Sequence, residues 1–179
     1  MNTEEKILKI LFEEPNKEFH IRNLARLTKL NPSTVSYTTE KLAKESILLR
    51  EKSNDLNTVI VKADTESQKY KLKKKSYNLQ KIFDSGLVTY LNTNLAYPTI
   101  ILFGSYAKAE NHQESDIDLF IISEEKKKPE LGKYEAILKA EIQVFIHTKK
   151  EFIKLMKTNS ELINNVINGT ILSGFLEVA

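Results

Sequence analysis

The spacing of apolar residues predicts an amphipathic helix at the start of the chain. Four apolar side chains recur there at helical intervals, at Ile7, Leu8, Leu11 and Phe12. Asn2 stands three residues before Glu5, the pattern of a capping box, and Pro15 lies beyond the helix end. A short strand over 18–21 and a second short helix around Leu24, Ala25 and Leu27 are predicted to follow.

A third helix is predicted from Pro32 to about Lys44. Asn31 is a favourable residue immediately before a helix, and proline is well accepted at the first helical position. Apolar and polar positions then separate into an inward face with Val35, Thr39 and Leu42 and an outward face with Ser33, Thr34, Ser36, Tyr37, Glu40, Lys41 and Lys44. Two strands over 47–52 and 58–62, joined by a polar loop over 53–57, form a predicted hairpin.

This order of elements resembles the winged helix-turn-helix of bacterial and archaeal regulators, in which the third helix enters the DNA major groove and the hairpin touches the backbone. The resemblance implies double-stranded DNA as a partner, and a homodimer where the DNA is read symmetrically. The side chains that can then contact DNA are Ser33, Thr34, Ser36, Tyr37, Lys41, Lys44, Arg50 and Lys52. Small units of this kind also serve in dimerisation or peptide docking, and Glu40 would repel phosphate, so these alternatives stay open.

Charge divides the chain in two. Residues 1–75 hold 16 Lys and Arg against 11 Asp and Glu, whereas residues 76–179 hold 11 against 13. A basic N-terminal part and a slightly acidic C-terminal part suggest two modules with different partners. The lysines of 69–75 can grip phosphates or form a solvated linker face, and we favour the linker.

The absence of cysteine excludes disulfides and thiolate metal sites and suits a reducing cytoplasm. The longest apolar runs are far shorter than the ~20 residues that a membrane helix needs. The N-terminus lacks the pattern of a leader peptide. We therefore expect a cytoplasmic protein without membrane contact.

The sequence predicts three regions: a first domain over 1–75, a helical connector over 76–97 and a second domain over 98–179. The connector reads as one long helix or two short ones with a break near Gly86. The second domain opens with an apolar strand over 99–103, followed directly by Gly104 and Ser105. After ten intervening residues, Asp116 and Asp118 introduce a second apolar strand.

These residue types suit a phosphate and metal site. Glycine allows a sharp turn with close backbone approach, and Ser105 at a helix start is placed near free N–H groups. Asp116 and Asp118 are two apart on a strand, so both should point to one face. Neighbouring carboxylates repel each other, and a hard divalent cation removes that repulsion. The pattern predicts Mg²⁺ that bridges the acids and a bound triphosphate.

The Gly-Ser and Asp-x-Asp pattern at this spacing resembles the DNA polymerase beta-like nucleotidyltransferases, most closely their minimal forms. The whole chain resembles archaeal fusions of a winged helix to such a domain. The resemblance implies that Gly104, Ser105 and Lys108 hold the phosphates of an NTP, with ATP as the expected nucleotide, and that Asp116 and Asp118 bind Mg²⁺ or Mn²⁺. Lys108 stands where the family usually has arginine. Lysine keeps the positive charge but lacks the bidentate fork of the arginine guanidinium.

A third carboxylate is usual in that family on a later strand, here predicted over 141–147. Its position falls on Gln143, a neutral residue that cannot act as a general base. Glu141 would share the face of Gln143 and is the candidate substitute for a catalytic role, or else a solvated strand-end residue. The fold class expected is α+β: a winged helix-turn-helix plus a nucleotidyltransferase-fold domain with a small mixed sheet. Two functions remain as hypotheses. One is an enzyme that transfers NMP to a hydroxyl, and the other is a DNA-binding regulator that only senses nucleotide.

Overall fold

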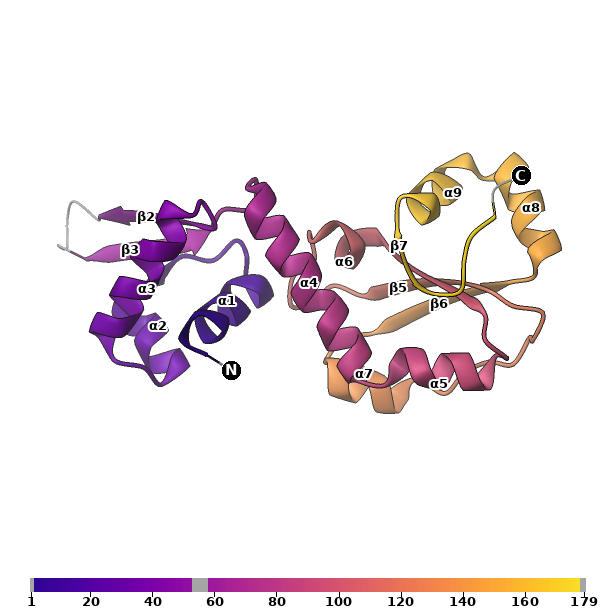
Figure 1. The fold of residues 1–179 in the computed structure, drawn as a ribbon, viewed down its shortest axis with the longest axis horizontal. Coiled ribbons are helices and arrows are strands. Elements are labelled where there is room, and N and C mark those ends of the chain that lie inside the picture. The colour runs from indigo at the N-terminus through magenta and orange to yellow at the C-terminus, as the bar shows by residue number, and fades with distance from the viewer. Residues whose placement is uncertain (1, 53–57, 178–179) are drawn as a thin grey trace. The chain divides into compact units, whose positions relative to one another are not determined.

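The computed structural model describes residues 2–52 and 58–177, and its chain divides into two compact units, 1–74 and 75–179. Among its described residues, the first unit contains three helices and three strands before helix α4, in the order drawn in Figure 1. These elements are α1 (Thr3–Glu13), β1 (Phe19–His20), α2 (Ile21–Thr28), α3 (Pro32–Lys44), β2 (Leu48–Lys52) and β3 (Val59–Ala63).

The helices of the first unit begin and end close to the predicted positions. The capping box of Asn2 and Glu5 is present, with both reciprocal hydrogen bonds formed. Pro32 occupies the first turn of α3, although the Asn31 side chain makes no capping hydrogen bond. Val35, Thr39 and Leu42 are buried, as the apolar spacing of α3 predicted. The predicted hairpin loop over 53–57 lies outside the described residues.

The three strands form an antiparallel sheet in the order β1-β3-β2. Buried apolar side chains from the helices and the sheet together fill the core of this unit. They include Ile7, Leu11, Phe19, Leu24, Val35, Leu42, Leu48 and Val61. Tyr70, on the following helix, is also fully buried and donates its hydroxyl to the carbonyl oxygen of Leu11 at 3.1 Å.

The lysine run is helical, which corrects the expected linker. It lies in α4 (Gln68–Asp84), where Lys73 bonds Glu4 at 3.0 Å. Lys74 is buried, and this burial lowers its pKa to about 8. Because the run sits on a helix with apolar residues at Tyr70 and Ile82, its spacing places some lysines against protein rather than water.

Residues 76–97 fall in the second unit rather than standing apart as a connector. Helix α4 ends at Asp84, and α5 (Leu87–Asn94) begins after Gly86, whose φ is +79°. Of the two predicted arrangements, one long helix or two helices with a break near Gly86, the structure has the second. Ile82, Leu87, Val88 and Leu91 are all buried in the core beside the second sheet.

The second unit is a mixed four-stranded sheet with helices on both faces. Its remaining elements are β4 (Thr99–Phe103), α6 (Gly104–Lys108), β5 (Ile117–Ile122), α7 (Gly132–Leu138), β6 (Ile142–His147), α8 (Lys149–Thr158), α9 (Ser160–Ile167) and β7 (Thr170–Ser173). The strand order is β6-β5-β4-β7. Strands β5 and β6 are parallel, and the other neighbours are antiparallel. The expected small mixed sheet is therefore confirmed.

Alternation along the strands builds two apolar layers. One layer joins Ile100, Leu102, Leu119 and Ile121 to residues of α4, α5 and α7. The other joins Ile101, Phe103 and Phe120 to Phe152 of α8 and to Ile163 and Val166 of α9. Within residues 2–52 and 58–177, every helix is too short or too polar to cross a membrane.

Candidate functional site

The turn after β4 brings bare backbone against a carboxylate. The chain leaves Phe103 in an extended conformation and enters α6 through Gly104, whose φ of +69° favours glycine. A Cβ placed on Gly104 would lie 2.3 Å from Oδ2 of Asp118. The turn therefore has room for the Asp118 carboxylate only because residue 104 has no side chain. Ser105 follows in the first turn of α6, where backbone N–H groups lack helical partners.

Both predicted aspartates lie at the start of β5. Asp118 pairs with Phe103 of β4 on one side and with Gln143 of β6 on the other. Asp116 stands two residues earlier, immediately before the strand, and is partly exposed like Asp118. Nε2 of Gln143 donates a hydrogen bond to Oδ2 of Asp116 at 2.7 Å. The structure thus brings Gly104, Asp116, Asp118 and Gln143 together at one end of the sheet.

The two carboxylates disfavour each other's charge. Burial raises the pKa of Asp118, and the negative charge of Asp116 raises it further. A divalent cation between the acids would oppose both effects, and hard carboxylate oxygens suit Mg²⁺ or Mn²⁺. The two carboxylates are therefore donors of the type that such a cation takes.

A third acidic ligand does not join them among the described residues. No group of three or more acidic or histidine side chains there is arranged to hold a metal ion. Glu141 is exposed just before β6 and lines an open hollow with Glu135, Ala136, Lys139 and Ala140. Of the two sequence interpretations of Glu141, this position agrees with the solvated strand end, and Gln143 is the β6 side chain that contacts an aspartate.

Lys108 lies at the end of α6 with its ammonium 3.4 Å from Oδ1 of Asn165 on α9. The Lys108 side chain is exposed. Asn165 was not a sequence candidate, since an isolated asparagine on a helix carries no pattern. The contact places α9 beside the predicted phosphate-binding residues.

Asn78 is a second residue that sequence reasoning missed. Its side-chain amide on α4 donates to the carbonyl oxygen of Tyr106 at 3.0 Å and to Oδ1 of Asn111 at 2.8 Å. Both asparagines are buried. The pair therefore tethers α6 and the loop that leads toward Asp116. The available signal was a polar residue four positions before Ile82, within the apolar stripe of the helix.

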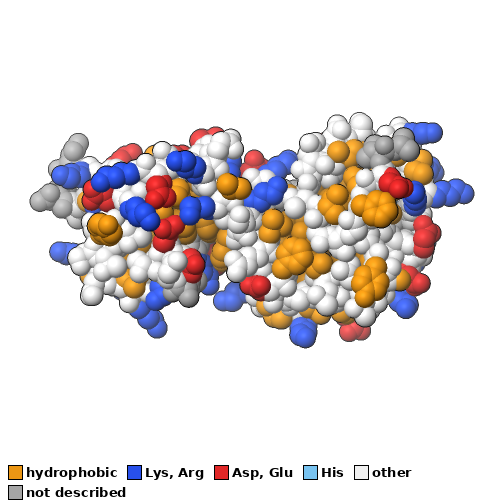
Figure 2. Space-filling view, viewed as in Figure 1, with side chains coloured by type: hydrophobic (Ala, Val, Ile, Leu, Met, Phe, Trp, Pro, Cys, Tyr) orange, Lys and Arg blue, Asp and Glu red, His pale blue; other side chains and the backbone are white. Residues whose placement is uncertain are grey.

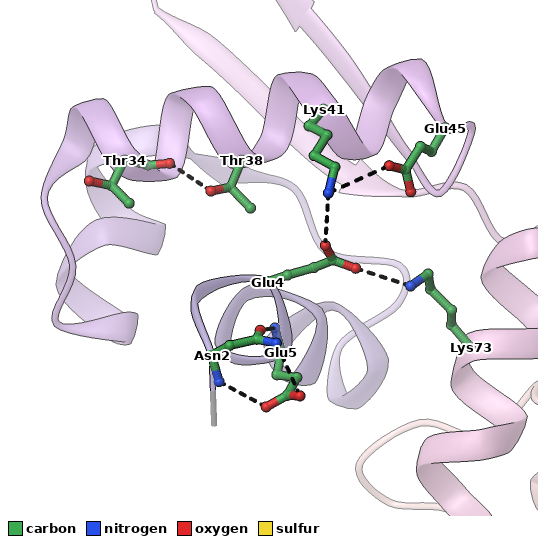
Figure 3. A network of polar contacts seen from close by, with 8 residues as sticks. All are labelled: Asn2, Glu4, Glu5, Thr34, Thr38, Lys41, Glu45 and Lys73. Atoms are coloured by element: carbon green, nitrogen blue, oxygen red, sulfur yellow. Dashed lines mark hydrogen bonds and ion pairs between the residues drawn. The ribbon is translucent and has the colours of Figure 1, made fainter.

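Lys41, one of the two α3 lysines predicted to bind DNA, is paired with acids, as Figure 3 shows. The ammonium of Lys41 lies 3.7 Å from Glu4 on α1 and 3.8 Å from Glu45. Glu4 also bonds Lys73 of α4 at 3.0 Å. The carboxylate of Glu4 thus joins three helices of the first unit, and the charge of Lys41 is partly balanced within the protein.

Glu40 on α3 similarly forms ion pairs with Lys44 and Arg50. Lys44 lies 3.0 Å and Arg50 3.4 Å from its carboxylate, and Arg50 also donates to Oγ of Ser36 at 2.7 Å. The bond and charge of Lys44 lower the pKa of Glu40, with a smaller contribution from Arg50. Figure 2 shows basic and acidic side chains interspersed on the first unit. The remaining DNA candidates, Ser33, Thr34, Tyr37 and Lys52, are exposed.

Comparison with known proteins agrees with the geometry at the second unit. The family described as Polymerase beta, Nucleotidyltransferase matches residues 85–174, from just before α5 to the end of β7. No curated protein and no solved structure matches the chain. The matched segment includes the Gly104 turn, both aspartates and Gln143, and it spans half of the 179 residues. The chain therefore belongs to the polymerase beta nucleotidyltransferase family.

Proposed function

We propose that the second unit binds an NTP together with Mg²⁺ and transfers its nucleoside monophosphate to a hydroxyl acceptor. The observation that carries this proposal is the contact of the Asp118 carboxylate with the bare turn at Gly104. This contact supports the proposal because carboxylate oxygens suit a hard cation and a bare backbone turn can be approached by a phosphate. ATP is the expected nucleotide by family resemblance.

In this proposal the turn at Gly104 and Ser105 and the ammonium of Lys108 hold the triphosphate. Asp116 and Asp118 would hold Mg²⁺, which supplies Lewis-acid polarisation of the phosphates when bound. The acceptor oxygen forms a bond to the α-phosphorus, and the bond from that phosphorus to the bridging oxygen breaks, releasing pyrophosphate. The acceptor loses its proton to solvent, since the amide of Gln143 cannot take it.

Labelling with α-³²P-ATP tests the transfer. The protein is incubated with Mg²⁺ or Mn²⁺ and fractionated cell extract, and labelled acceptors are sought. We expect label with the unaltered chain, none with Asp118→Asn, and full label with Glu114→Gln, an exposed acid in the preceding loop. Absence of transfer to any fraction by folded protein that binds ATP would contradict an enzyme.

A DNA-binding regulator that senses nucleotide is the second candidate. The exposed polar face of α3 favours it, and so does the neutral Gln143 at the site. The order of helices and strands in the first unit is also compatible with a winged helix-turn-helix. Here Ser33, Thr34 and Tyr37 would reach bases or phosphates, with Lys52 on the hairpin. The protein would bind as a homodimer on symmetric DNA.

Gel-shift titration of a random duplex library tests this second candidate at several salt concentrations. We expect binding that weakens steeply with salt and weakens further in Tyr37→Ala. Tyr97→Ala is the matched control, since Tyr97 is an equally exposed tyrosine of the second unit. Failure to shift any duplex at low salt would remove the DNA-binding candidate while leaving the transferase proposal intact.

A further inference from the structure

We infer that Gln143 orients Asp116 and limits the site to one divalent cation for each bound nucleotide. The inference rests on the proposed nucleotide site and specifies its metal content. It follows from the neighbours of Asp116 and from the charge available around the Gly104 turn.

The side-chain amide of Gln143 lies beside the Asp116 carboxylate. Gln143 is the direct β6 neighbour of Asp118, and it is exposed, so its side chain reaches along the sheet surface. Its Nε2 lies 2.7 Å from Oδ2 of Asp116. An N–H donor carries a partial positive charge, which occupies one side of that oxygen and repels a cation there. The hydrogen bond also holds the carboxylate plane, as bonds to metal-binding carboxylates commonly do.

The described residues around the Gly104 turn supply few anionic groups for cations. Two cations about 3.5–4 Å apart repel each other strongly and need shared anionic oxygens between and around them. Asp116 and Asp118 supply two carboxylates, and no third acid or histidine completes a metal-binding group within residues 2–52 and 58–177. One oxygen of Asp116 is engaged by the amide. The protein charge therefore suits one cation, with the nucleotide phosphates completing its coordination.

The other end of the amide is neutral. Oε1 of Gln143 could offer a second cation only a carbonyl-type oxygen, whereas a carboxylate would offer a charged one. Gln143→Glu keeps the size and shape of the residue while replacing this donor by a carboxylate. The variant should thus gain a second cation, and the exposed position makes the substitution compatible with folding.

Equilibrium dialysis with Mn²⁺ and a non-cleavable α,β-methylene ATP measures this directly. The ratio of Mn²⁺ to nucleotide retained by the full chain should be about one in the unaltered protein and should approximately double in Gln143→Glu. Gln80→Glu, which adds the same charge at an exposed position of α4, should leave the ratio unchanged. Gln143→Ala should weaken Mn²⁺-dependent nucleotide binding by about 10- to 100-fold, as loss of a partner to a metal ligand does.

Three results would overturn the inference. Two Mn²⁺ for each nucleotide in the unaltered protein would show that the amide does not restrict the site. An unchanged ratio in Gln143→Glu, or unchanged affinity in Gln143→Ala, would show that Gln143 is a surface residue with no influence on the metal. If folded, unaltered protein retained neither Mn²⁺ nor nucleotide, the proposed function itself would fail, an outcome distinct from a ratio of two.

Discussion

The carboxylate of Asp118 lies against the α-carbon of Gly104, so closely that a Cβ at this position would be 2.3 Å from Oδ2. Gly104 opens α6 directly after β4, Asp118 lies on β5, and the pairing of Phe103 with Asp118 brings the two residues together. This relationship couples the turn at Gly104 to the acidic pair, because a side chain at residue 104 would displace the Asp118 carboxylate.

Gly104→Ala should lose both stability and nucleotide binding. The variant combines the cost of positive φ, about 1–3 kcal/mol for a residue other than glycine, with displacement of Asp118. Gly86→Ala is the matched control, since its φ of +79° carries the first cost and its Cβ meets no atom within 4 Å. Urea unfolding and fluorescent-ATP titration measure both quantities. Equal affinities in the two variants would contradict the steric role of Gly104.

Asp118→Asn should stabilise the protein at neutral pH when divalent cations are removed with EDTA. Burial and the charge of Asp116 raise the pKa of Asp118, so its ionised form opposes folding. The stability associated with its protonated form is lost as pH rises through the raised pKa. The advantage of the variant should therefore be largest at neutral pH and shrink toward acidic pH.

Urea unfolding as a function of pH checks this behaviour of Asp118, with Glu114→Gln as an exposed control expected to show no such trend. With Mg²⁺ and ATP added, the order should reverse, since ligand that binds only the folded unaltered protein stabilises it. A variant that is less stable than the unaltered protein in EDTA at pH 7 would refute the assigned repulsion.

Asn78→Ala should weaken nucleotide binding although Asn78 lies outside the predicted motif. The change removes the hydrogen bonds that the Asn78 amide donates to the Tyr106 carbonyl and to the Asn111 side chain, and each such bond is worth about 0.5–1.5 kcal/mol. Asn92→Ala, which removes a bond to Ser173 of β7, should lower stability without a comparable loss of affinity. Calorimetric unfolding and ATP titration separate the effects. Parallel behaviour of the two variants would reduce Asn78 to a structural residue.

Glu40→Gln should strengthen DNA binding if α3 is the contact surface. The change removes a negative charge from the helix and releases Lys44 and Arg50 from their ion pairs. We expect a gain of about two- to tenfold at low salt and a steeper salt dependence, because more cations can replace counterions on DNA. Glu14→Gln, which breaks a pair with Lys17 just after the end of α1, is the control. Unchanged affinity, measured by fluorescence anisotropy, would exclude this helix face from the interface.

Sequence patterns determined the elements because helix and strand periodicity is local. The capping box at Asn2, the buried face of α3 and the strands on either side of Gly104 all follow from spacing within a few residues. The same period of two predicted that Asp116, just before β5, and Asp118, on β5, point to one face. Glycine and the acidic pair thus located the candidate site before any long-range contact was known.

Tertiary structure decided which side chains meet. Parallel pairing of β6 beside β5 gives Asp116 the amide of Gln143 rather than Glu141 as a neighbour, and α4 supplies Asn78 to the turn. Ion pairs with Glu4 and Glu40 likewise balance lysines that the helix pattern alone assigned to DNA. The physical reason is that charge and hydrogen bonding act through space, over distances set by strand order, register and helix packing, which local spacing along the chain does not specify.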